Sequence, residues 1–183
     1  MPRSGEDARR RLREAALELY RELGFDATTT AAIAERAGVT ERTYFRHFAD
    51  KREVLFDGEA ELREVLVGAI EGAPRELGPL ALLGLAYTAA IPLFVKGRRV
   101  AVLREQVIAV TPALQERAHA KSAAIADALS AALADRGLPR SSALLAAEIG
   151  RAAFGRAMRD WDGTSTPQLE ELIASAFDEV RAL

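Results

Sequence analysis

Arg42 and Arg46 lie four residues apart in a short segment whose residue types suit contact with an anion. Residues at this spacing share one face of a helix. The guanidinium group is planar and forked, so it pairs well with phosphates and with the edges of guanine bases. Tyr44 and Phe48 are also four apart, on a different face, where they can pack inward. The segment is therefore predicted to be a helix with one cationic face and one apolar face.

The flanking residues predict that this helix is the second of a helix-turn-helix. Gly38 permits the left-handed turn that a residue with a Cβ resists. Thr29 or Thr30 can cap the helix before the turn, and Thr40 can cap the helix after it. Residues 36–52 hold five Lys/Arg against two Asp/Glu, in a chain whose formal net charge is −2. A solvated charged face is the ordinary alternative, but the glycine and both caps favour a helix that enters the DNA major groove.

We expect the cationic face to meet base edges and its flanks to meet the phosphate backbone. Arg42, Thr43 and Arg46 are predicted to face the groove, and His47 and Lys51 to touch phosphate. Lys51 would lie in the first turn of the following helix, where a positive charge is unfavourable because it opposes the helix dipole. A bound anion such as a DNA phosphate would explain why a lysine stands at this position. The full set predicted to contact DNA is Thr29, Thr30, Thr40, Arg42, Thr43, Phe45, Arg46, His47 and Lys51.

The segment from about Glu6 to Leu55, roughly the first third of the chain, resembles the TetR family of bacterial transcriptional regulators. The resemblance rests on the order and spacing of Ala15-Ala16-Leu17-Glu18-Leu19-Tyr20, Gly24-Phe25, Thr28-Thr29, Ile33-Ala34, Ala37-Gly38-Val39, Thr43, His47-Phe48 and Lys51. It implies an N-terminal DNA-binding domain followed by helices of variable sequence that bind a ligand and form a dimer. The family usually has Tyr where Phe45 stands, so Phe45 is expected to make an apolar contact instead of a hydrogen bond to phosphate.

Helical periodicity and the lack of a convincing strand predict an all-α fold of about nine helices. The chain has 183 residues, 49% apolar and 28% charged, which is an ordinary balance for a globular protein. We expect a three-helix head in residues 1–55, with its helix-turn-helix at about 29–48. Residues 56–183 are expected to form a helical effector-binding and dimerisation domain.

Two long helices are expected after the head. One is predicted from Lys51 to about Glu71, ending before a Gly-Ala-Pro break. The uncharged stretch Leu77–Val95 is predicted to be a central helix, buried all round and kinked at Pro92. Gly97 is expected to separate it from a short helix.

The last two predicted helices carry stripes suited to association. The earlier helix carries a stripe of small residues, Ala146, Gly150, Ala153 and Ala157. The later helix carries a stripe of larger apolar side chains at three- and four-residue spacing, Leu169, Leu172, Ile173, Ala176, Phe177 and Val180. Two such helices per subunit could form a four-helix bundle across a two-fold axis, or the stripes could pack inside one subunit. The family resemblance favours the homodimer.

The ligand pocket is weakly marked in the sequence. Its candidate lining residues are Tyr87, Phe94, Arg104, Gln106, His119, Phe154, Met158 and Trp161. As a set they suggest an apolar cavity with few polar groups, which would take a small apolar effector. No cluster of His, Asp and Glu has metal-ligand spacing, and no catalytic motif stands out, so neither a metal, nor a cofactor, nor an enzyme is expected.

These observations favour a cytoplasmic regulator that binds double-stranded DNA as a homodimer and does not engage a membrane. No signal peptide is recognisable, and the chain has no cysteine. The expected function is a repressor that binds a pseudo-palindromic operator and is released by the effector. Two alternatives stay open: a DNA-binding architectural dimer without an effector, and an all-helical enzyme or small-molecule carrier.

Overall fold

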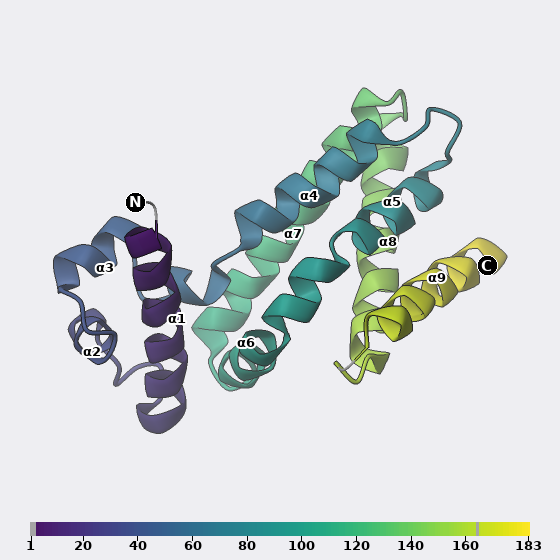
Figure 1. The fold of residues 1–183 in the computed structure, drawn as a ribbon. Helices are drawn as coiled ribbons and strands as arrows, with labels where there is room; N and C mark the ends of the chain where they lie inside the picture. The colour runs from purple at the N-terminus through teal and green to yellow at the C-terminus, as the bar shows by residue number, and fades with distance from the viewer. Residues whose placement is uncertain (1–2, 164) are drawn as a thin grey trace. The chain divides into compact units, whose positions relative to one another are not determined.

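The computed structural model describes residues 3–163 and 165–183 of the chain. These residues form nine α-helices, one 3-10 helix and no strand (Figure 1), so the predicted all-α fold is confirmed. Contacts divide the chain into two compact units. The first unit contains the N-terminal residues up to Gly58 together with Arg99–His119, and the second contains Glu59–Arg98 and Ala120–Leu183.

The first unit begins with a three-helix head made of α1 (Arg3–Leu23), α2 (Thr30–Arg36) and α3 (Glu41–His47), which the short 3-10 helix η1 (Glu53–Phe56) follows. The α1 helix ends at Gly24, whose φ of +84° is the left-handed conformation that glycine adopts without strain. The apolar faces of all four elements bury a common core; its members include Leu12, Leu17, Leu19, Tyr20, Phe25, Ile33, Tyr44, Phe48 and Leu55.

The corner between two later helices also belongs to this first unit, although its sequence position predicts that it lies in the domain 56–183. The end of α6 (Ile91–Ala109) and the start of α7 (Pro112–Asp135) contribute Val107 and Leu114 to the core of the head. The Thr111 hydroxyl closes the corner by donating to the Val107 carbonyl at 2.9 Å. Sequence periodicity could not reveal this packing, because it joins segments fifty or more residues apart.

The continuous helix predicted from Lys51 to Glu71 is wrong. The chain forms η1 and then turns at Gly58, whose φ is +93°, before α4 (Glu59–Gly72) begins. Asp57 is extended and accepts a hydrogen bond from Arg9 Nε on α1 at 2.6 Å. This tertiary contact and the glycine that follows it interrupt a segment whose apolar periodicity is helical throughout.

The single kinked helix predicted for Leu77–Val95 is also wrong. Two helices occupy this stretch, α5 (Pro79–Ala89) and α6, and the chain bends at Ala90 between them. Pro92 lies in the first turn of α6, where its missing N–H leaves no helical hydrogen bond unmade. Gly97, predicted to end a helix, is inside α6.

The predicted burial of this stretch on all sides is correct only in part. Leu83, Ala86 and Tyr87 are buried, whereas Leu85 and Val95 are 39% and 38% exposed. Among the residues that the structure describes, no single helix has the length and apolar character to cross a membrane. The bent pair formed by α5 and the first part of α6 meets both criteria only when its two members are taken together.

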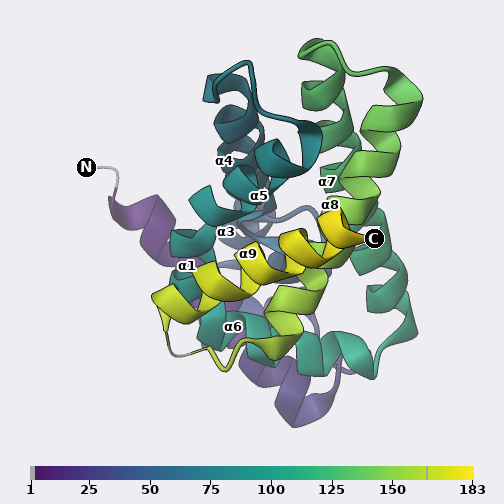
Figure 2. The same cartoon turned by 90° about the vertical axis from the view of Figure 1, so that its right-hand side faces the viewer.

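The second unit buries its largest core between α4, α5, α7, α8 (Arg140–Asp160) and α9 (Thr166–Ala182), with α8 and α9 side by side (Figure 2). The stripes that the sequence offered for a dimer lie within this core. A Cβ on Gly150 would come within 2.9 Å of Leu83 Cδ1, and Phe177 packs on Gly84. Both stripes are therefore buried in the protomer itself, the arrangement that the sequence left as the alternative.

Candidate nucleic-acid interface

The helix-turn-helix forms at the predicted place. The Thr29 hydroxyl accepts from the Ala32 amide at 3.1 Å and so caps α2, which decides between the two threonines proposed for this role. Thr40 caps α3 in the same way, accepting from the Thr43 amide at 3.2 Å. Gly38 between the helices has a φ of +66°, as the turn requires.

The two faces of α3 separate as the sequence predicts. Tyr44 is fully buried and Phe48, the residue after the helix, is 4% exposed. On the opposite side Arg42 and Arg46 are exposed, and Phe45 leaves 53% of its surface free. The Phe45 ring meets the Tyr44 ring edge-on at 5.5 Å, but half of its surface stays in water near two arginines, so this surface suits a partner that offers anionic and apolar groups together.

Arg42 and Arg46 form no ion pair within the described parts of the chain. Other arginines of the head are neutralised: Arg36 of α2 pairs with Glu18 and Glu22 of α1, and Arg52 pairs with Asp50. The α3 helix therefore presents two arginines whose charge no ion pair in the described residues balances, although the whole chain carries a net charge of −2.

The threonines predicted to meet DNA already take part in the head's own hydrogen bonds. The Thr30 hydroxyl donates to Glu41 Oε1 at 2.5 Å, which joins the start of α2 to the start of α3. The Thr40 and Thr43 hydroxyls lie 3.0 Å apart. These contacts hold the first turns of both helices in register, and a hydroxyl oxygen keeps further capacity to bond a phosphate oxygen.

His47 is the half-buried titratable group at the end of α3. Its Nε2 is buried without a hydrogen-bond partner among the described residues. Burial, together with the positive charges of Arg46 and Arg9, lowers the pKa of His47 below its ordinary value, although Asp57 opposes this shift. The fold therefore favours the neutral imidazole over the protonated form, and a nearby phosphate would raise its pKa.

Lys51 is placed differently from the sequence expectation. It lies in a turn before η1, not in the first turn of a long helix. Its ammonium group donates to the carbonyl oxygens of Phe25, Asp26 and Thr28 at 2.8, 3.3 and 3.2 Å. A phosphate that contacted Lys51, as the sequence predicts, would compete with these three carbonyls for the N–H groups of the ammonium.

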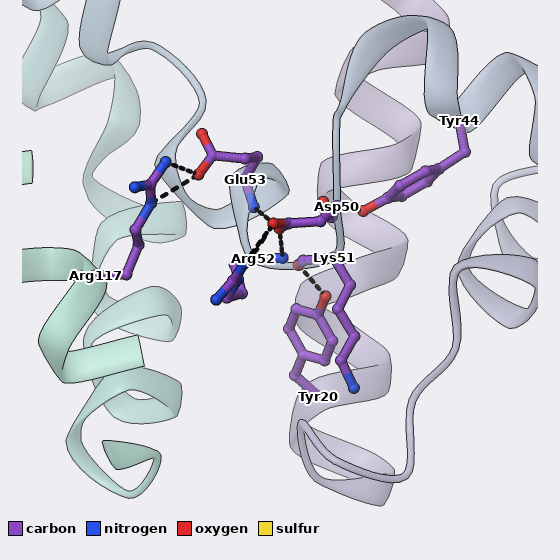
Figure 3. A network of polar contacts seen from close by, with 7 residues as sticks. All are labelled: Tyr20, Tyr44, Asp50, Lys51, Arg52, Glu53 and Arg117. Atoms are coloured by element: carbon purple, nitrogen blue, oxygen red, sulfur yellow. Dashed lines mark hydrogen bonds and ion pairs between the residues drawn. The ribbon is translucent and has the colours of Figure 1, made fainter. Parts of the chain in front are cut away.

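Two buried tyrosine hydroxyls fix the turn that contains Lys51 (Figure 3). Tyr20 of α1 donates to the Lys51 carbonyl at 2.5 Å, and Tyr44 of α3 donates to the Asp50 carbonyl at 2.9 Å. Desolvation raises the pKa of both phenols, which keeps them protonated donors. The sequence predicts the inward position of Tyr44 but not the partners of either hydroxyl, because these lie in a turn without periodicity.

The Asp50 carboxylate caps the start of η1 in the same network. Its Oδ1 accepts from the amides of Arg52 and Glu53 at 2.7 and 3.1 Å. Burial disfavours the charge, but the Arg52 guanidinium and the two amides outweigh it and hold the pKa of Asp50 below its ordinary value. Glu53 in turn accepts two bonds from the Arg117 guanidinium of α7 (Figure 3), which ties the α6–α7 corner to the head.

This head matches a known family model. Residues 12–57 fit the model described as bacterial regulatory proteins of the tetR family. The head of the chain is therefore a DNA-binding domain of the TetR type. The matched residues run from the middle of α1 to the turn after η1, so they contain the whole helix-turn-helix and the network around Lys51.

Two curated regulators resemble the N-terminal part of this chain. The HTH-type transcriptional regulator TcmR of Streptomyces glaucescens is 38% identical over 76 residues, which are 42% of the chain and 34% of that protein. The HTH-type regulator YvkB of Bacillus subtilis (strain 168) is 38% identical over 66 residues, 34% of the chain and 35% of that protein. The similarity thus spans about a third of the length of these relatives.

Solved structures share the fold over nearly the whole chain. A transcriptional regulator from Aquifex aeolicus VF5 has a TM-score of 0.59 at 17% identity, covering 94% of this chain and 99% of its own. The TetR-family repressor FadR of Thermus thermophilus, solved with lauroyl-CoA, has a TM-score of 0.56 at 22% identity, covering 94% and 93%. These similarities show that the C-terminal helices follow the architecture of the family.

The predicted pocket residues fall into two groups in this TetR-family fold. Five lie in the second unit and pack on its core: Tyr87, Phe94, Phe154, Met158 and Trp161. The other three, Arg104, Gln106 and His119, belong to the α6–α7 corner of the first unit, where Gln106 and His119 are exposed. Sequence distance alone could not separate the groups, because α6 and α7 each contribute to both units.

The aromatic members of the first group form one stack. The Tyr87 and Phe154 rings lie 4.3 Å apart and nearly parallel, and Phe94 meets Phe154 at 4.9 Å. Burial raises the pKa of Tyr87 to about 12, so its phenol is neutral. At the end of α8, Trp161 Nε1 donates to the Ser165 carbonyl at 2.9 Å. The second unit therefore contains an apolar aromatic interior.

Proposed function

We propose that the protein is a homodimeric transcriptional repressor that binds a pseudo-palindromic operator and is released by a small apolar ligand. The exposed, unpaired charge of Arg42 and Arg46 is the observation that carries the proposal. These side chains lie on a recognition helix whose opposite face is anchored by Tyr44 and Phe48. Because the proposed operator lies on the bacterial chromosome, the protein would act in the cytoplasm.

The roles proposed for the interface follow from burial and chemistry. Arg42, Thr43 and Arg46 would read base edges, and exposed Phe45 would supply an apolar contact such as packing on a thymine methyl group. The remaining contacts would position the protein on phosphate, which fixes register without reading sequence. They would come from Thr29, Thr30 and Thr40 at the helix starts and from His47.

A dimer is proposed because a two-fold pair of heads matches a two-fold pair of half-sites. The recognition helices would have to lie about 34–36 Å apart, or a multiple of this spacing. Since the predicted stripes of α8 and α9 are used inside the protomer, we propose the outer side of α8 as the dimer surface. Leu144 and Leu145 are 48% and 62% exposed there. Adjacent exposed leucines suit burial against a second copy.

The effector is proposed to enter the aromatic interior of the second unit. Displacing the stacked Tyr87, Phe94 and Phe154 rings would open an apolar site with the Tyr87 phenol as its polar group. FadR of Thermus thermophilus shows that this fold can hold a ligand with a long apolar chain. Binding to the native state raises the melting temperature by mass action, so a thermal-shift screen of small apolar compounds identifies candidates.

Selection of bound duplexes from a random pool tests the proposed function. We expect the recovered DNA to contain an inverted repeat, with half-sites about one helical turn or a multiple of it apart. Compounds that raise the melting temperature should then weaken binding to this DNA, measured by fluorescence anisotropy. Recovery of unrelated sequences would contradict operator recognition. Stabilising compounds that leave the DNA affinity unchanged would contradict release by a ligand.

The pKa of His47 gives a further prediction about DNA binding. If His47 meets a phosphate, the complex favours its protonated form, so the affinity should rise as the pH falls from about 8 to about 6. His47→Gln should remove this dependence. Because the folded protein holds the pKa of His47 low, protonation also reduces its stability below about pH 6.5, and anisotropy is therefore measured well below the melting temperature. An identical pH profile for both proteins would rule out the phosphate contact.

A further inference from the structure

The ammonium group of Lys51 is fully engaged inside the head. An ammonium has three N–H bonds, and three backbone carbonyls, those of Phe25, Asp26 and Thr28, lie within 3.3 Å of Nζ. The Phe25 ring covers a further side, with its centroid 4.3 Å from Nζ, a geometry in which the ring quadrupole attracts the cation. Contact with a phosphate would require Lys51 to give up part of this arrangement.

The three carbonyls belong to the loop that leads from α1 into α2. Carbonyl oxygens that converge without a donor repel one another and lose their hydrogen bonds to water, so the loop needs a cation or several donors at this point. The buried Thr28 side chain holds the same loop from the other side, donating to the Gly24 carbonyl at 2.8 Å. Thr29, the next residue, is the N-cap of α2.

The backbone of Lys51 is itself anchored to α1. Its carbonyl accepts the Tyr20 hydroxyl, and Figure 3 shows the Tyr20 and Lys51 side chains next to each other. One residue therefore joins three parts of the head: α1 through its carbonyl, the α1–α2 loop through its ammonium, and the turn after α3 through the chain.

We propose that Lys51 is a positioning residue, which sets the orientation of the first turn of α2 for DNA and does not itself contact phosphate. This inference rests on the proposed DNA binding and refines the assignment of one residue within it. The ammonium acts on the Thr28 carbonyl, and the adjacent Thr29 then presents its hydroxyl and the first amides of α2 in a fixed direction.

The dependence of affinity on salt distinguishes the two roles. A lysine that touches phosphate releases a counterion, so its removal lowers the slope of log Kobs against log salt concentration by about one unit. For Lys51→Met we expect at least tenfold weaker operator binding with an unchanged slope. Arg46→Met is the matched comparison, since it removes a cation that is proposed to read base edges, and it should reduce the discrimination between operator and unrelated duplex. A slope lowered by about one unit in Lys51→Met would overturn the inference.

A measurement without DNA keeps this test separate from the proposed function. In Lys51→Met, amide hydrogen exchange should accelerate at Ala32, whose N–H donates to the Thr29 cap, while Leu66 in the second unit should exchange at the parental rate. Lys51→Arg retains the charge, but its planar guanidinium cannot direct three bonds from one nitrogen at these carbonyls, so it should also bind DNA more weakly. Parental exchange at Ala32, or parental affinity in Lys51→Arg, would overturn the positioning role. If the unaltered protein binds no duplex, the proposed function fails, while the exchange data still report on the loop.

Discussion

Phe48→Ala should lower the free energy of unfolding by about 3–5 kcal/mol, the usual cost of deleting a buried phenylalanine ring. Phe48 is 4% exposed, its ring centroid lies 5.7 Å from that of Tyr44, and the Arg9 guanidinium covers it at 5.2 Å. Removing the ring leaves a cavity between α1 and the end of α3. Since small domains are stable by only about 5–15 kcal/mol, the head should unfold far more readily. Urea denaturation followed by circular dichroism measures the loss.

Phe45→Ala is the matched control for this prediction. It deletes the same ring three residues earlier, inside α3, at a position that is 53% exposed. A surface substitution of this kind usually changes stability by less than about 0.5 kcal/mol, while the loss of an apolar contact should weaken DNA binding. Equal destabilisation by both substitutions would show that the orientation of α3 is wrong.

The head could be predicted closely because its signals are local. A threonine that can cap, a glycine that can turn left-handed and two aromatic residues four apart each act over a few residues. Thr29, Gly38 and Thr40 perform the expected roles, and Tyr44 and Phe48 point inward. Local consistency of this kind is what allows a short segment to specify its own fold.

Contacts between distant residues were the part that the sequence could not reveal. Lys51 looks like a phosphate ligand when only its neighbours are read, and the carbonyls that it binds lie 23 to 26 residues earlier. The break at Gly58 has the same origin, since Arg9 of α1 holds Asp57 in an extended conformation. In both cases a tertiary partner overrides the helical periodicity of the segment.

The second unit shows a different limit. The small-residue stripe of α8 and the apolar stripe of α9 are covered within the protomer, whereas the sequence, with the family resemblance, favours a second copy as their cover. Periodicity specifies that a face is covered, but not whether the cover comes from the same chain or from a second copy. Leu83 of α5 lies against Gly150, so this stripe is covered within the protomer, and the exposed leucines of α8 are the surface proposed for a second copy.

The double substitution Arg42→Ala with Arg46→Ala should weaken operator binding by about 10²–10⁴-fold. A good contact between arginine and a base is worth about 1–3 kcal/mol of discrimination, and a factor of ten corresponds to about 1.4 kcal/mol. The fold should be unaffected, since both side chains are exposed and form no ion pair in the described residues. The single variants can couple because the residues are neighbours, so all three are measured by anisotropy.

Arg36→Ala is the control that separates a general loss of positive charge from the loss of contacts made by α3. It removes the same charge from the head, but Arg36 lies on α2 and is already paired with Glu18 and Glu22 of α1. If general charge attracts the DNA, Arg36→Ala and either single variant on α3 should weaken binding alike. If α3 reads the groove, Arg36→Ala should bind the operator nearly as tightly as the parent, and only the α3 variants should lose discrimination between operator and unrelated duplex. Parental discrimination in the double variant would move the reading surface away from α3.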